Sequence, residues 1–258
     1  MGLLALCALV AALSLAVGAS LFYKAFPEAG IDFAVTREES RLQAEVFLAD
    51  QGLATAAHHH SAVFSFDGTA KTFLERSLGL QGATRAIAET VRLWRWEHRW
   101  VRPGHKEEYR LAHTTDGRLV AFEHRLEEER AGAHLPGPQA RALAERLATQ
   151  VLGRDLGAYE FVEAERLDRP NRTDHLFTWR LRGWEQAGAT YRFELRLHGS
   201  SLGGFDEYLK VPEAWSRQYQ ELRSHNQAAG QVATVFMLLT WVGLVVVLAI
   251  NLRQRRVC

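Results

Sequence analysis

Two long uncharged runs, one near each end of the chain, constrain the structure more than any other feature of the sequence. The runs Gly2–Phe22 and Val232–Leu252 contain no Asp, Glu, Lys or Arg. At about 1.5 Å per residue, a helix of roughly 21 residues is about 30 Å long, which is enough to cross the hydrocarbon core of a bilayer. We therefore expect two transmembrane helices, and a lipid bilayer is the first partner that the sequence predicts.

Basic residues after the second run predict the orientation of the chain. Arg253, Arg255 and Arg256 follow it directly, and such clusters are typical of the cytoplasmic end of a span. With two spans, residues 25–230 then lie on the far side of the membrane. The first run ends in small residues that signal peptidase accepts, so it is either a retained signal anchor or a cleaved signal peptide. Residues 25–230 are exported in both cases.

The composition narrows the possible partners of the exported part. The whole chain has 31 Lys+Arg and 30 Asp+Glu, a formal charge of +1, which excludes a strongly basic nucleic-acid-binding protein. Removing Lys24 and the three terminal arginines leaves 27 basic against 30 acidic residues, a formal charge of −3. The strong preference for arginine over lysine favours a bacterial source and so the bacterial inner membrane. Cys7 and Cys258 lie outside the exported part, which therefore has no disulfide framework.

Two of the helices predicted in the exported part have clear start and stop signals. Thr36 and Glu39 have the spacing of a capping box at a helix start, and Gly52 is a natural stop. Three side chains of this helix supply part of its expected apolar stripe: Leu42, Val46 and Leu48. The second helix begins after Pro138 and ends at Gly153.

Strands are predicted after each helix. In Tyr191–His198, apolar and polar side chains alternate strictly, which is typical of a half-buried strand. The segment His175–Leu181 shows the same period. Tyr109–His113 and Leu119–His124 flank Thr114–Gly117, whose Asp-Gly pair favours a hairpin turn. Two tandem α+β units, each a helix plus an antiparallel sheet, explain these patterns better than one large barrel.

These observations predict the fold class and the division of the chain. The class is α+β, with the two units lying between two transmembrane helices. A proline near its start predicts a helix from Val211 that runs towards the second span. The expected parts are a signal anchor or signal peptide (1–24), a first exported unit (25–133), a second exported unit (134–211), a juxtamembrane helix (212–230), a transmembrane helix (231–252) and a cytoplasmic tail (253–258).

Histidines and tryptophans are the first candidates for a ligand site. Adjacent residues of an extended chain point to opposite faces, so within His58–His60 only the first and third could share a metal. We favour a solvated loop over such a weak metal site. Trp94, Trp96 and Trp100 fall on one strand face with arginines between them. Sheet core is the favoured interpretation, and a groove for a ligand or peptide is the alternative.

Catalytic motifs are missing from the sequence. It contains no nucleophile elbow, phosphate loop, CxxC pair or HExxH, and we assign no catalytic residue, metal or cofactor. The acidic clusters Glu38–Glu39, Glu107–Glu108 and Glu127–Glu129 are common surface features, for which solvation is the default.

Several short segments between Ala62 and Asn226 carry a family resemblance. They are Ala62–Asp67, Thr72–Glu75, Trp96 before Thr115–Arg118, Tyr159–Glu163, Asp174–Thr178, and Leu209–Arg217 with Tyr219 and Arg223–Asn226. The helix-then-hairpin units resemble PepSY-type domains. The order of segments resembles the N-terminal extracytoplasmic region of bacterial CPBP-family intramembrane peptidases, which are similar to type II CAAX proteases.

The chain departs from that family in its catalytic motif. Active members share EExxxR and downstream histidines on further membrane helices, whereas Arg41, Arg110 and Arg130 follow the acidic pairs here at the wrong offset. The resemblance therefore implies a non-catalytic, membrane-anchored exported domain that regulates an intramembrane peptidase or presents a peptide or protein to it. Such a chain would be the front part of a peptidase or a stand-alone regulator. The alternative is an independent envelope sensor or scaffold, and an exported enzyme is the least favoured class.

Overall fold

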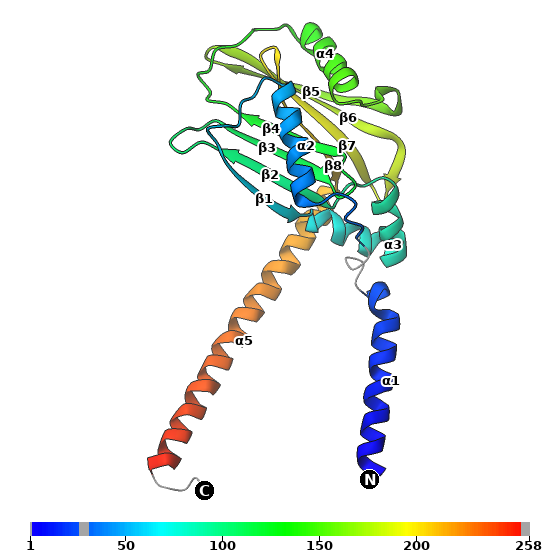
Figure 1. Cartoon of the computed structure of the whole chain (residues 1–258), viewed down its shortest axis with the longest axis vertical. Coiled ribbons are helices and arrows are strands. Elements are labelled where there is room, and N and C mark those ends of the chain that lie inside the picture. The colour runs from blue at the N-terminus through cyan, green and yellow to red at the C-terminus, as the bar shows by residue number, and fades with distance from the viewer. Residues whose placement is uncertain (1, 26–30, 254–258) are drawn as a thin grey trace. The chain divides into compact units, whose positions relative to one another are not determined.

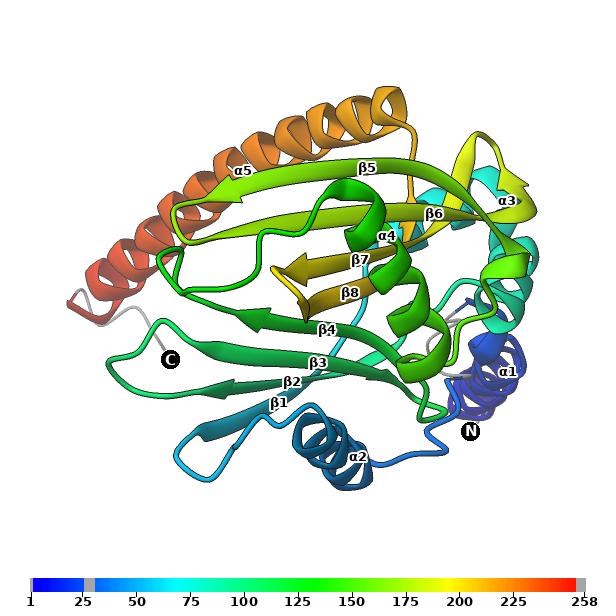
Figure 2. The same cartoon turned by 90° about the horizontal axis from the view of Figure 1, so that it is seen from above.

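The strands pair in one antiparallel sheet of eight, in the order β1-β2-β3-β4-β8-β7-β6-β5 (Figures 1 and 2). The computed structural model describes residues 2–25 and 31–253, so Arg255 and Arg256 lie outside the described residues. The chain forms two compact units, Met1–Lys210 and Val211–Cys258. The α+β class predicted from the sequence is confirmed.

The strands and helices have the following bounds. The strands are β1 (His59–Ser65), β2 (Arg95–Val101), β3 (Glu108–Thr114), β4 (Leu119–Arg125), β5 (Tyr159–Arg169), β6 (Arg172–Gln186), β7 (Ala189–His198) and β8 (Ser201–Lys210). The helices are α1 (Gly2–Ala25), α2 (Arg37–Asp50), α3 (Gly68–Glu89), α4 (Gly137–Arg146) and α5 (Glu213–Arg253), with short helical turns η2 (Leu147–Val151) and η3 (Leu156–Ala158).

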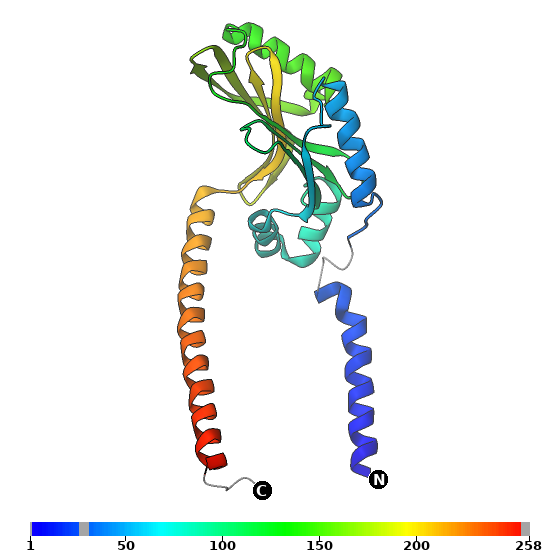
Figure 3. The same ribbon diagram turned by 60° about the vertical axis from the view of Figure 1, so that its left-hand side comes forward.

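The strand order is symmetrical about the junction of β4 with β8. Helix α2 precedes β1–β4, helix α4 precedes β5–β8, and each set of four strands forms a meander. The two meanders meet through their last strands, where Ala121, Phe122 and Glu123 pair with Asp206, Phe205 and Gly204. Both halves therefore share one continuous sheet. Figure 3 shows that α2 and α4 lie on the same side of it.

Helix α2 begins with the predicted capping box. The Thr36 backbone N–H donates to the Glu39 carboxylate over 2.8 Å, and the Glu39 N–H donates to the Thr36 hydroxyl over 3.3 Å. The predicted stripe is only partly correct, because Leu48 is buried while Leu42 and Val46 are exposed. The helix instead turns Ser40, Ala44 and Leu48 towards the sheet, a spacing of four that keeps them on one face.

Small side chains also seat α4 against the sheet. Ala140, Ala144 and Ala148 are fully buried, and their spacing of four places them on one helical face. Gly153 follows with a φ of +62°, a conformation that glycine adopts without strain. The predicted helix is present, but α4 begins at Gly137 and ends at Arg146, and the wider helical turn η2 continues it to Val151, just before Gly153.

The core lies between these two helices and the sheet. The predicted alternation in β7 is confirmed, because Tyr191, Phe193, Leu195 and Leu197 are all buried. Phe193, Leu195 and Leu197 belong to one cluster with side chains of α2, α4 and neighbouring strands. The predicted hairpin is also present, since β3 and β4 are antiparallel and Gly117 has a φ of +87°.

Two elements depart from the sequence interpretation. Helix α3 was not predicted; Asp67 caps it by accepting hydrogen bonds from the N–H groups of Thr69 and Ala70. The helix is kinked at Gly79, whose φ of +68° is not helical. The apolar side chains before and after this kink therefore do not follow one helical period. The favoured solvated loop at His58–His60 is wrong, because His59 and His60 belong to β1 and pair with Val101 and Trp100.

Helix α5 is the one helix in the described part of the chain that is long and apolar enough to cross a membrane. It runs from Glu213 to Arg253 without a break, so the juxtamembrane and apolar segments form a single helix. Helix α1 contains a shorter apolar stretch, Leu6–Phe22.

Candidate binding site on the open sheet face

The register of the strands divides their side chains between two faces. Leu111, Phe122 and Phe205 pair in one row and pack in the core beneath α2 and α4. Their sequence neighbours point to the opposite face because side chains alternate along a strand. We call this opposite side the open face.

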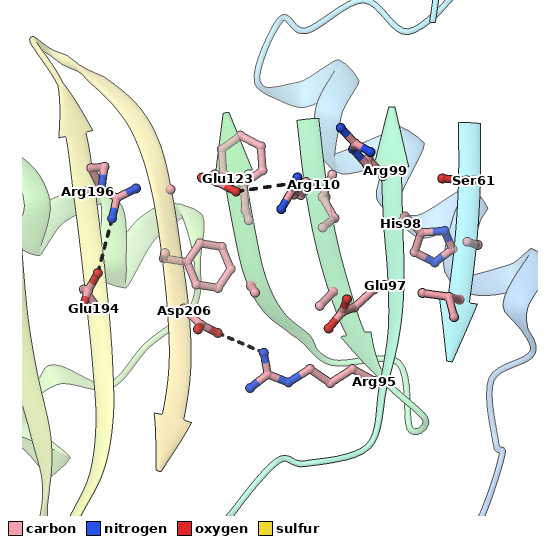
Figure 4. A pocket seen from close by; sticks show the side chains of 18 residues that line it. Ser61, Arg95, Glu97, His98, Arg99, Arg110, Glu123, Glu194, Arg196 and Asp206 are labelled. Atoms are coloured by element: carbon pink, nitrogen blue, oxygen red, sulfur yellow. Dashed lines mark hydrogen bonds and ion pairs between the residues drawn. The ribbon is translucent and has the colours of Figure 1, made fainter. Parts of the chain in front are cut away.

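A hollow of about 650 Å³ lies on the open face. Six strands line it, β1, β2, β3, β4, β8 and β7, so both halves of the sheet contribute (Figure 4). Short residues meet at its centre, where Ala112, Ala121 and Gly204 belong to β3, β4 and β8. Longer charged side chains surround them, and this difference in length produces the hollow.

Gly204 has a structural reason to be glycine. A Cβ atom at this position would lie 2.7 Å from the carbonyl oxygen of Phe122, which is too close for van der Waals contact. The close approach of β8 to β4 therefore requires glycine, and it also leaves the centre of the hollow without a side chain.

Four arginines and four carboxylates line the hollow: Arg95, Arg99, Arg110, Arg196, Glu97, Glu123, Glu194 and Asp206. Arg95 pairs with Asp206 at 3.1 Å, whereas Arg196–Glu194 and Arg110–Glu123 are separated by 3.6 and 3.9 Å. Figure 4 shows these three pairs around the hollow. The last two are long for hydrogen-bonded ion pairs. The arginine side chains of these two pairs, Arg196 and Arg110, remain 42% and 41% exposed, so a ligand can reach them.

Burial changes the acidity of two carboxyl groups in the hollow. It raises the pKa of Asp206 to about 6, against the opposing effect of Arg95. Burial also raises the pKa of Glu194. A carboxylate that is partly withdrawn from water gains more from a nearby cation than one in open water.

Glu108 lies beside the hollow and is not solvated as expected. Its side chain is only 8% exposed and pairs with Arg99, Arg110 and Arg125 at 2.5–2.9 Å. Burial raises its pKa, but the three arginines outweigh this effect and leave the pKa below its usual value. The default of a solvated surface is therefore wrong for Glu108, which anchors the arginines at one end of the open face.

The tryptophans selected from the sequence do not line this hollow. Trp100 is buried in the core, and the Trp96 indole donates to the carbonyl of Val35 over 2.9 Å. Trp94 precedes β2 and lines a separate hollow of about 260 Å³ with α3. The interleaved arginines Arg95 and Arg99 line the larger hollow, together with Glu97 and His98 of the same segment.

A serine and two histidines form a hydrogen-bonded chain on the helix-covered side. The Ser40 hydroxyl lies 2.9 Å from His98 Nε2, and His98 Nδ1 lies 3.0 Å from His60 Nε2. The order resembles a nucleophile, a base and an orienting group, but Ser40 is fully buried on the face of α2 that meets the sheet. A substrate cannot reach it, and the chain instead fastens α2 to the sheet.

Among the described residues, no group of three or more His, Cys, Asp or Glu side chains is arranged to hold a metal ion. His58, the other member of the proposed pair, packs against the ring of Tyr109 at 4.9 Å. No known protein family, no curated protein and no solved structure matches this chain.

Proposed function

We propose that this protein is a non-catalytic, membrane-anchored binding domain whose hollow on the open face holds a peptide segment of another protein. The observation that carries the proposal is the hollow itself, which six strands line with charged groups around a floor of Ala112, Ala121 and Gly204. Ligand sites are commonly concave and contain a few polar groups that fix orientation. The hollow is concave, and its loosely paired arginines and carboxylates are the polar groups that can orient a ligand.

The proposal includes the membrane anchor and the export of the sheet. The length and hydropathy of α5 support one span, and the uncharged run Gly2–Phe22 supports a second or a signal peptide. The arginines from Arg253 onward favour a cytoplasmic end. The sheet then lies outside the cytoplasm of a bacterial cell, where it meets exported proteins.

We further propose that the two halves are tandem PepSY-like units and that the partner is a CPBP-type intramembrane peptidase. The mirrored strand order, with one helix before each meander, supports the duplication. The sequence resemblance supports the choice of partner. The chain would present a bound peptide to the peptidase or regulate it.

Photo-crosslinking of the full chain in its native membrane tests this proposal. Benzoylphenylalanine is placed at Ala121 in the hollow and, as a control, at Val46, which is 61% exposed on α2. We expect adducts at Ala121 that contain peptide segments of exported proteins together with a multispan membrane protein carrying EExxxR. Adducts with exported proteins alone would favour an envelope sensor or scaffold. Equal, weak labelling at both positions would contradict a binding site in the hollow.

A further inference from the structure

Two cross-strand rows of opposite charge lie side by side in the hollow. The first row pairs Arg99, Arg110, Glu123, Gly204 and Arg196 across β2, β3, β4, β8 and β7. It carries three arginines and one glutamate, and we call it the basic row.

The second row is the acidic row. It pairs Glu97, Ala112, Ala121, Asp206 and Glu194 across the same five strands. It carries three carboxyl groups and no basic residue. Each of its residues lies two positions along the strand from a member of the basic row, so the rows are about 7 Å apart.

From this arrangement we infer that the ligand is an extended peptide with one acidic and one basic side chain two residues apart, Glu-x-Arg or a close equivalent. In an extended peptide, residues i and i+2 point to the same side and are also about 7 Å apart. The acidic side chain then faces the basic row, and the basic side chain faces the acidic row. This inference rests on the proposed function of the hollow.

The charged groups of both rows are available for such contacts. In the basic row, the side chains of Arg99 and Arg110 are 51% and 41% exposed, and no described residue forms a hydrogen bond with the buried Nε of Arg110. These two arginines are direct cross-strand neighbours, an arrangement that is unfavourable without nearby negative charge. Glu108, two residues from Arg110 on the same face of β3, supplies part of that charge, and a ligand carboxylate would add to it.

The acidic row is suited to a cation because its carboxylates have few basic partners and short residues lie between two of them. Asp206 is 46% exposed but lies in the hollow, and its carboxylate has one arginine partner, Arg95. Glu97 accepts a hydrogen bond from the Ser65 hydroxyl over 2.8 Å. The short residues Ala112 and Ala121 separate Glu97 from Asp206 in the row. They leave room for a guanidinium or ammonium group between the two carboxylates.

The test measures binding of labelled peptides to the full chain in phosphatidylcholine nanodiscs. Four peptides with blocked ends share a Gly/Ser background and contain Glu-Ala-Arg, Ala-Glu-Arg, Glu-Ala-Glu or Arg-Ala-Arg. We expect Glu-Ala-Arg to bind about five- to tenfold more tightly than Ala-Glu-Arg, because partly exposed charge pairs contribute up to about 1 kcal/mol each. Raising the ionic strength should reduce this preference.

A charge-reversal variant separates recognition from a merely structural role. Arg99→Glu with Arg110→Glu makes the basic row acidic, so the preferred peptide should become Arg-Ala-Arg. The matched control reverses two arginines on the exposed surface of α4, Arg141→Glu with Arg146→Glu, and should keep the preference for Glu-Ala-Arg. Circular dichroism checks that each variant is folded. If Arg99→Glu with Arg110→Glu does not fold, Glu97→Gln with Glu194→Gln tests the acidic row and should lower the preference for Glu-Ala-Arg over Glu-Ala-Glu.

The outcomes distinguish this inference from the proposed function. A wild-type chain that binds all four peptides equally, or a folded charge-reversed variant that still prefers Glu-Ala-Arg, would overturn the inference while the hollow remained a binding site. Absence of binding to every peptide, together with no specific crosslinking at Ala121, would overturn both.

Discussion

Glu207 shows how one buried charged residue holds the halves of the sheet together. Its carboxylate is fully buried and accepts hydrogen bonds from Arg118 at 2.9 Å and from the Tyr191 hydroxyl at 2.9 Å. Arg154, which follows α4, pairs with it at 2.7 Å. The carboxylate therefore links the β3–β4 turn, the segment after α4, and strand β7.

Removal of this charge should destabilise the fold strongly. In Glu207→Gln, the guanidinium groups of Arg118 and Arg154 lose their shared carboxylate while Arg154 stays mostly buried. Breaking a buried pair in this way costs about 3–5 kcal/mol of unfolding free energy. Denaturant unfolding of the full chain in detergent measures the change. The control Glu123→Gln, whose charge lies on the open face, should cost less than about 1 kcal/mol, and equal losses in both variants would contradict the proposed role of Glu207.

At the scale of elements, α2 rests on neutral histidines. Burial lowers the pKa values of both His98 and His113 to about 4. Burial also lowers the pKa of His60, and the positive charge of Arg41 on α2 lowers it further. Glu38 and Glu45 of the same helix oppose this effect. The contact between α2 and the sheet therefore favours uncharged imidazoles.

The stability of the fold should decrease as the pH falls from about 6.5 towards 4. In this range an unfolded histidine binds a proton and His98 in the fold does not, so protonation favours unfolding. At pH 5 the loss is about 2 kcal/mol for each such histidine. Asp206 acts in the opposite direction, because its raised pKa makes the folded chain bind a proton below about pH 6.

A histidine variant isolates the effect of His98. Unfolding free energies of wild type and His98→Gln are compared at pH 7 and pH 5 in the same detergent. His98→Gln should lose about 2 kcal/mol less than wild type between these values. An identical pH dependence of the two proteins would contradict a depressed pKa for His98.

Local periodicity in the sequence identifies several helices and strands, but it does not show which distant strands pair with one another. The alternation in Tyr191–His198 identifies the buried face of β7 because each side chain there follows the strand period. Helix α3 lacks such a regular pattern, since Gly79 interrupts it; the capping residue Asp67 was the available signal. The open-face hollow depends on β4 pairing with β8, residues about 80 positions apart. No local pattern reveals that pairing, and the arginines and carboxylates appeared in the sequence as ordinary surface charge.

At the scale of the whole molecule, the sequence predicts two spans and an exported sheet. Fusion of alkaline phosphatase at Gly153 or at Cys258 tests this topology in cells, because the enzyme is active only outside the cytoplasm. We expect activity from the Gly153 fusion alone, as the arginines after α5 favour a cytoplasmic end. Activity from the Cys258 fusion would contradict the orientation.

The central claim is that the hollow binds a peptide and leaves it intact. The most direct measurement incubates the full chain in nanodiscs with the Glu-Ala-Arg peptide, determines the affinity, and then recovers the peptide for mass spectrometry. The same measurement on Ala121→Trp, which fills the centre of the hollow, tests the location of the site. We predict intact peptide throughout and a loss of at least about tenfold in affinity for Ala121→Trp, equivalent to about 1.4 kcal/mol. Cleaved peptide, or unchanged affinity in a folded Ala121→Trp variant, would contradict the account.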